Sequence, residues 1–243
     1  MGAMMRALLD LQEIELQLVD IRRELDRKQR QVSAQQVRLE TARQEFDSRH
    51  ESTRRLQMQF DELDVEIKAR SAHIDKLRQQ LNTVRTNKEY AALLSQMNNE
   101  KADLSKYEAR AMQLMEEVEA RKRELAATEQ QQQGEAGRLG ELRTQHEQSV
   151  ESLSGRLERL TKQRDEAAAR LDPKVVEQFN RLSKKYGGEA MAELQPADPR
   201  RTEFVCGGCF MSKRADIVNA LRLKDELVFC KSCGRILYLK DEA

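Results

Sequence analysis

Residues 11–25, LQEIELQLVDIRREL, place aliphatic side chains alternately three and four positions apart. The aliphatic positions of this alternation are Leu11, Ile14, Leu18, Ile21 and Leu25. On a helix, a 3-4 alternation lines these side chains up along one side, where they can pack against the same stripe of a second helix. The stretch therefore predicts a coiled-coil helix.

The alternation continues as far as residue 84. Of the 22 positions in this frame 17 are apolar, and neither Gly nor Pro interrupts residues 11–84. The polar exceptions are Lys28, Gln35, Arg49, Thr53 and Arg70. A composition with 35% charged and 4% aromatic residues also suits long helices better than one compact globule. Disorder is the alternative for so polar a chain, but a disordered chain has no reason to keep a period.

A second, weaker frame begins at Tyr90, after the first one fails. Its apolar members are Leu94, Met97, Leu104, Ala111, Met115, Val118, Leu125, Ala136, Leu139, Val150, Leu153, Leu157, Leu160, Ala167 and Leu171. Between the frames, Thr86 and Glu89 have the spacing of a capping box, which begins a helix. We therefore expect one helix to end near residues 82–85 and a second to run back antiparallel from Thr86. A stutter within one continuous helix is the alternative.

A glycine-rich stretch, QQQQGEAGRLG, occupies residues 130–140. Each of its three glycines weakens a helix by up to about 1 kcal/mol relative to Ala. In an antiparallel hairpin this stretch lies opposite residues 31–36, which are also poor in large apolar side chains. We predict a kink or hinge at this level, and a harmless surface irregularity is the alternative.

A shorter helix is expected after the hairpin. Asp172 followed by Pro173 is typical of a helix N-cap with proline at the first helical position. The helix should end near Tyr186, because Gly187 and Gly188 follow it. We expect a first strand over residues 189–194 and a turn or linker over residues 196–199.

All four cysteines fall in two Cys-x-x-Cys pairs, Cys206 with Cys209 and Cys230 with Cys233. Each pair can form a tight turn that points two sulfurs at one metal, and two such turns complete a tetrahedron of thiolates. Strand-like residues flank the pairs at 203–205, 227–229 and 236–239. A redox pair would need a single Cys-x-x-Cys in a βαβ context, and disulfides would need an oxidising compartment. We predict a zinc ribbon with one structural Zn²⁺; iron is the alternative metal.

The predicted fold class is therefore mainly α, a long antiparallel coiled-coil hairpin followed by a small C-terminal β zinc ribbon. The expected domains are the helical hairpin over residues 5–172 with its tip at 82–89, a connecting helix over 173–188 and the C4 zinc ribbon over 189–243. Gly207, Gly208 and Gly234 are expected to provide the positive φ that metal-binding turns often need.

The net charge and the motifs of the chain limit the classes of function that we expect. The net charge is +1, which removes the simplest argument for nucleic-acid binding. No apolar run approaches the roughly 18 residues of a membrane span, and the N-terminus lacks the apolar core of a secretory signal, so we expect a cytoplasmic protein. No Ser/His/Asp set, phosphate loop or second metal constellation is present, so we do not expect an enzyme.

Basic residues of the cysteine segment form either a local patch or an ordinary solvated surface. They are Arg200, Arg201, Lys213, Arg214, Arg222, Lys224, Lys231 and Arg235.

The chain resembles a bacterial family of C4-type zinc-ribbon proteins with a long N-terminal coiled-coil hairpin. The resemblance rests on residues 84–90 (VRTNKEY), 206–211 (CGGCFM) and 230–238 (CKSCGRILY). Lys213-Arg214 stands where the family usually has Leu-Pro, and Lys231 where it often has Pro. The resemblance implies a non-enzymatic adaptor; some members are linked to flagellar or secretion regulation through an alternative sigma factor, and RNA binding has also been proposed.

The leading functional hypothesis is an adaptor that binds a protein partner through the coiled coil and the ribbon. An RNA- or DNA-binding regulatory protein is the alternative, and whether two hairpins pair as a homodimer stays open. A polymerase secondary-channel factor is a third idea, which the tip disfavours because it lacks a set of acidic residues, and a structural spacer is the simplest reading. The candidate partner-binding residues are Arg85, Asn87, Lys88, Glu89, Tyr90, Lys213, Arg214 and Arg235.

Overall fold

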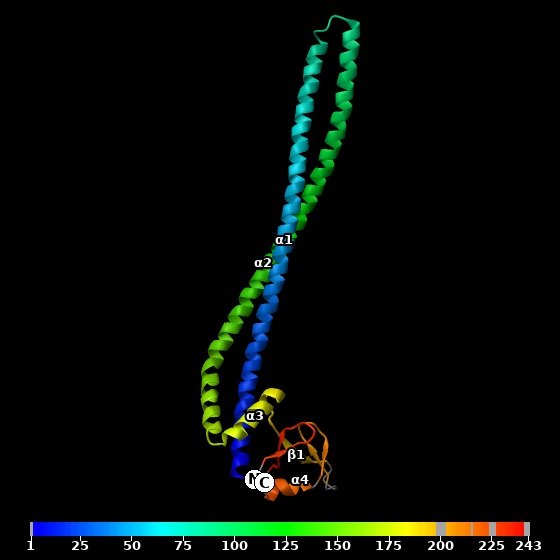
Figure 1. The fold of residues 1–243 in the computed structure, drawn as a ribbon. Helices are drawn as coiled ribbons and strands as arrows, with labels where there is room; N and C mark the ends of the chain where they lie inside the picture. The colour runs from blue at the N-terminus through cyan, green and yellow to red at the C-terminus, as the bar shows by residue number, and fades with distance from the viewer. Residues whose placement is uncertain (1, 198–202, 215, 224–226, 241–243) are drawn as a thin grey trace. The chain divides into compact units, whose positions relative to one another are not determined.

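The computed structural model of the chain describes residues 2–197, 203–214, 216–223 and 227–240. Figure 1 follows the order of its helices and strands along the chain. The helices are α1 (Ala3–Leu81), α2 (Asn87–Ala168), α3 (Pro173–Tyr186) and α4 (Asp216–Leu223), and the strands are β1 (Met191–Pro196), β2 (Phe204–Cys206), β3 (Ser212–Lys213), β4 (Val228–Phe229) and β5 (Ile236–Tyr238). The predicted fold class is confirmed, since α1 and α2 are long helices packed together and the strands follow them.

The chain forms two compact units, which share α1 and α2. One contains Val32–Glu141, and the other contains Met1–Gln31 with Leu142–Ala243. None of the helices in the described ranges is long and apolar enough to cross a membrane.

In the unit over residues 32–141, α1 and α2 are joined by a short turn. The two helices are separate, as the capping box predicts, so the continuous helix with a stutter is wrong. The backbone N–H of Glu89 donates to the Thr86 hydroxyl at 3.3 Å. That hydroxyl in turn donates to the Glu89 carboxylate at 2.7 Å. The two side chains therefore hold each other at the start of α2, which satisfies one of the free N–H groups of its first turn.

The buried residues of α1 form its seam, the side that packs against α2, and they follow the predicted frame. From Leu11 onward every buried residue of α1 lies on it: Leu11, Leu18, Ile21, Val32, Gln35, Leu39, Ala42, Thr53, Ile74 and Leu77. The predicted period therefore identifies which side of α1 faces its partner.

The buried residues of α2 match the predicted frame at some positions and differ from it at others. Met97, Ala111, Val118, Leu139 and Leu160 are buried as expected. The intervening buried residues, however, come one position early: Leu114, Thr128 and Ser149 face the seam. Met115 and Val150, assigned to the seam, are exposed, and Tyr90 is 49% exposed. Val150 misled the assignment because the buried residue beside it is polar Ser149, and Met115 did so because it and its buried neighbour Leu114 are both apolar.

Polar seam residues of α1 pair with polar residues of α2. Arg70 forms an ion pair with Glu100 at 3.0 Å, and its guanidinium lies 4.6 Å from the centre of the Tyr107 ring. Further pairs are Gln35 with Glu135, Lys28 with Ser149 and Arg49 with Glu124. Because these polar groups are satisfied only in one alignment of the two helices, they select the register of the hairpin.

The glycine-rich stretch over residues 130–140 is helical throughout. A β-carbon built on Gly134, Gly137 or Gly140 would meet nothing within 4 Å. Opposite this stretch, the Gln35 side chain donates to the Glu135 carbonyl at 3.1 Å. The division between the two units falls beside this level, after Gln31 and after Glu141. The hinge itself stays a prediction.

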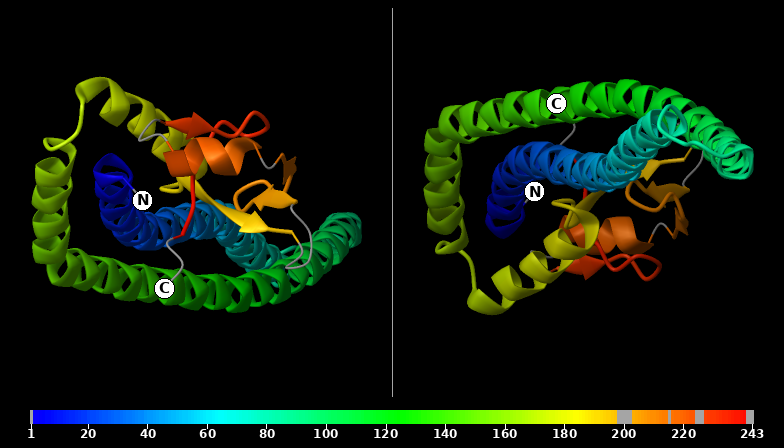
Figure 2. Two further views of the ribbon diagram at one scale, coloured as in Figure 1. Left: turned by 90° about the horizontal axis from the view of Figure 1, so that it is seen from below. Right: turned by 90° about the horizontal axis from the view of Figure 1, so that it is seen from above.

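In the other unit, α3 leads from the end of α2 to the strands (Figure 2). Asp172 caps α3 as predicted, its carboxylate accepting from the Lys174 N–H at 2.8 Å, and Gly187 ends the helix with φ +62°. The strands form one sheet in the order β3-β2-β1-β5-β4. The strand predicted at 189–194 is β1, which pairs parallel with β5 and antiparallel with β2.

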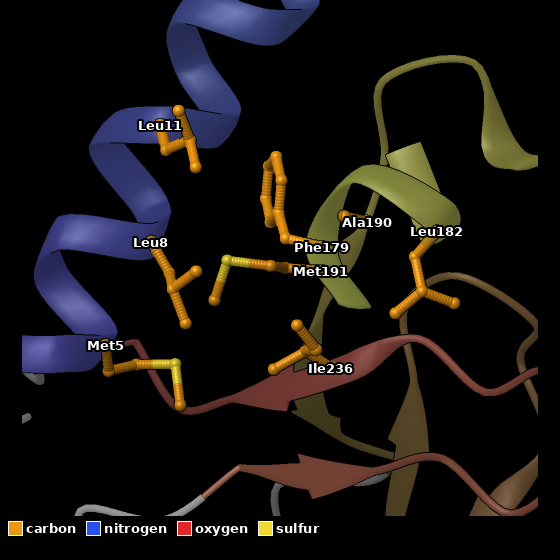
Figure 3. Close-up of a cluster of buried hydrophobic side chains, with 8 residues drawn as sticks. All are labelled: Met5, Leu8, Leu11, Phe179, Leu182, Ala190, Met191 and Ile236. Carbon is orange, nitrogen blue, oxygen red and sulfur yellow. The ribbon is translucent and has the colours of Figure 1, made fainter. Parts of the chain in front are cut away.

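The hydrophobic core of this unit is assembled from segments far apart in the sequence (Figure 3). Its buried members are Met5, Leu8 and Leu11 of α1, Phe179 and Leu182 of α3, Ala190, Met191 of β1 and Ile236 of β5. Leu8, Leu11, Phe179 and Ile236 are fully buried. The first turns of α1 therefore complete the core on which α3 and the sheet are packed.

Replacing Leu8 tests this packing. Leu8→Ala is expected to lower the free energy of unfolding by about 2–5 kcal/mol, because it removes a fully buried side chain and leaves a cavity. Chemical denaturation measures the change. Val37→Ala, at an exposed position of α1, is the control and should change stability by less than about 0.5 kcal/mol. Equal effects of the two substitutions would contradict the docking of α1 in this core.

Two glycine substitutions should act in opposite directions. Gly137→Ala should raise the free energy of unfolding by about 1 kcal/mol, because a helical position gains Ala without a clash. Gly188→Ala should lower it, because Gly188 has φ +102° and its β-carbon would lie 2.9 Å from the Leu16 side chain. Denaturation curves of both variants check the signs, and a destabilised Gly137→Ala would refute this description of α2.

Candidate metal centre

The two cysteine pairs form turns with the same backbone hydrogen bonds. In the first, the Cys206 carbonyl accepts from the Phe210 N–H at 2.7 Å, and the Cys206 N–H donates to the Met211 carbonyl at 3.1 Å. In the second, the Cys230 carbonyl accepts from the Gly234 N–H at 2.7 Å, and the Cys230 N–H donates to the Arg235 carbonyl at 2.8 Å. We call these turns the first and second knuckle, residues 206–211 and 230–235.

The glycines of the knuckles have different roles from those expected. Gly234 has a positive φ of +81°, as predicted, whereas Gly207 and Gly208 are not among the residues with positive φ. Gly208 is instead required by close approach, because a β-carbon there would lie 2.4 Å from the Arg235 guanidinium. Gly207 donates its N–H to the Glu193 carbonyl at 2.8 Å, which ties the first knuckle to β1.

The four sulfur atoms lie within 4.8 Å of one another. The Cys206 and Cys233 sulfurs are 3.9 Å apart, and those of Cys209 and Cys230 are 3.7 Å apart. A tetrahedral Zn²⁺ with Zn–S bonds of about 2.3 Å would place its sulfurs about 3.8 Å apart, so this arrangement fits one zinc ion. Four protein ligands leave no open position, so the site is structural. Among the described residues, this is the one metal-binding group of His, Cys, Asp or Glu side chains.

Zinc binding requires the thiols to lose their protons. Burial raises the pKa of the Cys206 thiol to about 12, although the N–H groups of Gly208 and Cys209 act in the opposite direction. Burial also acts to raise the pKa of Cys230, but hydrogen bonds from the N–H groups of Cys233 and Ser232, together with those from the Cys233 and Cys209 thiols, outweigh it and lower this pKa to about 6. Protons therefore compete with the metal, mainly at Cys206, and zinc affinity should rise with pH.

Arg235 connects the knuckles to α3 and to Glu189, which lies between α3 and β1. Its guanidinium donates to the Gly208 carbonyl at 2.6 Å and to the Glu189 carbonyl and carboxylate, each at 3.0 Å. The same group lies 4.0 Å from the centre of the Tyr186 ring, and the Tyr186 hydroxyl donates to the Cys233 carbonyl. Both knuckles are thereby held against the end of α3.

The structure separates the candidate partner-binding residues into two groups. The exposed ones are Arg85, Asn87, Lys88, Glu89, Tyr90 and Arg214. Lys213 and Arg235 are only 8% exposed, and the Lys213 ammonium donates to the Ser232 hydroxyl at 2.9 Å. Their side chains support the knuckles and offer little surface to a partner. Arg200, Arg201 and Lys224 lie outside the described residues, and the side chain of Arg222 is also outside them.

Sequence reasoning missed two supporting side chains of this site, Tyr186 and Glu189. Tyr186 was noted only as the end of a helix, and Glu189 only as the start of a strand. Neither carries a local signal, because their contact with Arg235 joins residues 46 or more positions apart. The element α4 was also not predicted; Ile217 and Leu221 of this helix pack beside the cysteines.

Metal analysis tests the centre. The chain should bind one zinc ion, and Cys230→Ser should abolish tight binding because it removes one thiolate from the tetrahedron. Competition with a chelating dye should show zinc affinity rising with pH, as the thiols release their protons. Purified protein that contains iron in place of zinc, or affinity that does not change with pH, would contradict the assignment.

Comparison with known proteins agrees with this description. Residues 205–237 match the family model of the C4-type zinc ribbon domain. No functionally curated protein matches the chain significantly. Among solved structures, the CT398 protein of Chlamydia trachomatis is 21% identical with a TM-score of 0.81, over 99% of this chain and 100% of that one. The HP0958 protein of Helicobacter pylori is 14% identical with a TM-score of 0.62, over 98% of each chain.

A structure from Mycobacterium smegmatis is 19% identical with a TM-score of 0.53, over 95% of this chain and 97% of that one. At these identities the likeness shows a shared fold. Residues 205–237 of this chain are thus a C4-type zinc ribbon domain, carried by a chain with the fold of CT398.

Proposed function

We propose that this protein is a non-enzymatic adaptor that binds a protein partner through the tip of its hairpin and through its zinc ribbon. The main observation behind the proposal is the exposure of side chains at the hairpin tip. Arg85, Asn87, Lys88 and Tyr90 are all exposed there, whereas Thr86 and Glu89 cap the helix. An exposed aromatic side chain between charged and amide groups is a common anchor for protein recognition.

The metal centre supports a role without catalysis. Four cysteine ligands leave no position for water or substrate, so the metal stabilises the domain and does not activate a reactant. Because some members of the family that the chain resembles are linked to flagellar or secretion regulation, we propose a partner from transcription or from the secretion and flagellar machinery. Clustered thiolates of a zinc site persist in a reducing compartment, which supports action in the cytoplasm.

Partner capture tests the proposal. A variant with Asn87→Ala, Lys88→Ala and Tyr90→Ala should lose at least about tenfold in the amount of bound partner, because anchor residues dominate binding energy. The experiment is affinity purification from the native host, with and without nuclease. A variant with Asn98→Ala and Lys101→Ala, two exposed positions of α2 away from the tip, is the matched control.

Two results would overturn the proposal. One is equal capture by the tip variant and the control. The other is loss of all captured proteins after nuclease treatment, which would favour the RNA- or DNA-binding alternative.

A further inference from the structure

The first knuckle contains a residue type that its backbone disfavours. Phe210 directly follows the second cysteine of the first knuckle, as Gly234 does in the second, and both donate to the carbonyl of the first cysteine. Both residues have positive φ, +59° for Phe210 and +81° for Gly234. Among the described residues, Phe210 is the one non-glycine residue with positive φ. A bulky side chain is costly in this conformation, and such outliers gather at functional sites.

Packing within the chain does not offset this cost. The Phe210 side chain is 74% exposed, and Met211 beside it is 56% exposed. Phe229, which is 37% exposed, directly precedes Cys230, and the Cys230 and Cys209 sulfurs are 3.7 Å apart. The two aromatic residues therefore flank the same pair of ligands. Exposed apolar side chains next to ligands that lie this close together mark a candidate interaction site.

Positive charge surrounds these apolar side chains. Residues 207–214 and 227–235 contain four Lys or Arg residues and no Asp or Glu. The zinc tetrathiolate contributes −2 and the Glu189 carboxylate, which pairs with Arg235, contributes −1, so the local sum is +1. The Lys213–Ser232 hydrogen bond ties the second knuckle to β3, and Arg214 and Lys231, the exposed sequence neighbours of these two residues, carry the remaining cations. We call Phe210, Met211, Arg214, Phe229 and Lys231 the knuckle surface.

The knuckle surface fits a peptide better than a nucleic acid. Two of its four nearby cations, Lys213 and Arg235, are almost buried and already hydrogen-bonded. Two exposed cations can make far fewer phosphate contacts than the roughly 6–10 that are typical of nucleic-acid binding. They suffice, however, to orient a carboxylate-bearing peptide around an apolar anchor.

We propose that the knuckle surface binds an acidic peptide segment of a protein partner, which places a large apolar side chain against Phe210. This inference rests on the proposed adaptor function and specifies the chemistry of the partner at the ribbon. Carboxylates of the segment pair with Arg214 and Lys231. A basic segment is disfavoured, because the two charged side chains that the knuckle surface exposes are both cations.

Selection from a display library of random short peptides on the zinc-loaded full chain tests the proposal. Selected peptides should be rich in Asp and Glu around a Leu, Phe or Trp. Phe210→Asn should weaken the best peptide at least about tenfold. It should leave zinc content and melting temperature intact, because Asn tolerates positive φ better than Phe. Arg214→Glu should also weaken binding, whereas Val37→Asn, at an exposed apolar position of α1, should not.

Three outcomes would overturn this inference: selected peptides without acidic enrichment, unchanged affinity of the Phe210→Asn variant, or oligouridylate binding that Phe210→Asn abolishes. If one of these outcomes is found and the tip variant still loses capture of the host partner, the adaptor function stands and only the knuckle surface is wrong. Loss of capture by the tip variant, with peptide binding retained at the ribbon, would support both proposals.

Discussion

The first turns of α1 supply part of the hydrophobic core that the ribbon and α3 need. A ribbon with strands of two to six residues buries little apolar area, and domains this small need a metal or added packing. Leu8 and Leu11 provide the packing against Phe179 and Ile236, and the zinc site fixes the two knuckles. Arg235 links these contributions by holding both knuckles beside Tyr186. We therefore expect the base of the hairpin and the metal centre to depend on one another for stability.

Polar pairs along the seam set the alignment that this docking requires. A shift of one heptad between α1 and α2 would preserve most apolar contacts but would separate Arg70 from Glu100 and Gln35 from Glu135. A buried polar group left unpaired at a seam position lowers the free energy of unfolding by more than the loss of an apolar contact does. The group has lost its hydration and has gained no hydrogen-bond partner in exchange. Four of the five polar residues that interrupt the α1 frame, Lys28, Gln35, Arg49 and Arg70, therefore contribute to the specificity of the register, whereas apolar residues there would contribute only to stability.

Much of this architecture could be predicted from local sequence patterns. The α1 seam, the Thr86 and Asp172 caps and the cysteine ligands all depend on residues within a few positions of one another. Features that join distant segments could not be predicted in this way. The Arg235 contacts with Glu189, the core built by Met5 and Phe179, and the α2 positions that face α1 depend on tertiary packing. The α2 seam is the clearest case, because the polar residues Thr128 and Ser149 face α1 while apolar Met115 and Val150 are exposed.

The mutual dependence of α1 and the metal centre is tested most directly by hydrogen exchange with and without zinc. If α1 completes the core of the zinc ribbon, removing zinc should speed exchange in residues 5–16 and 173–186 as well as in residues 204–238. Exchange in residues 60–81 of α1, near the tip, should stay unchanged and serves as the internal control. Faster exchange confined to residues 204–238 would contradict the account, because the ribbon would then unfold without loosening the base of the hairpin.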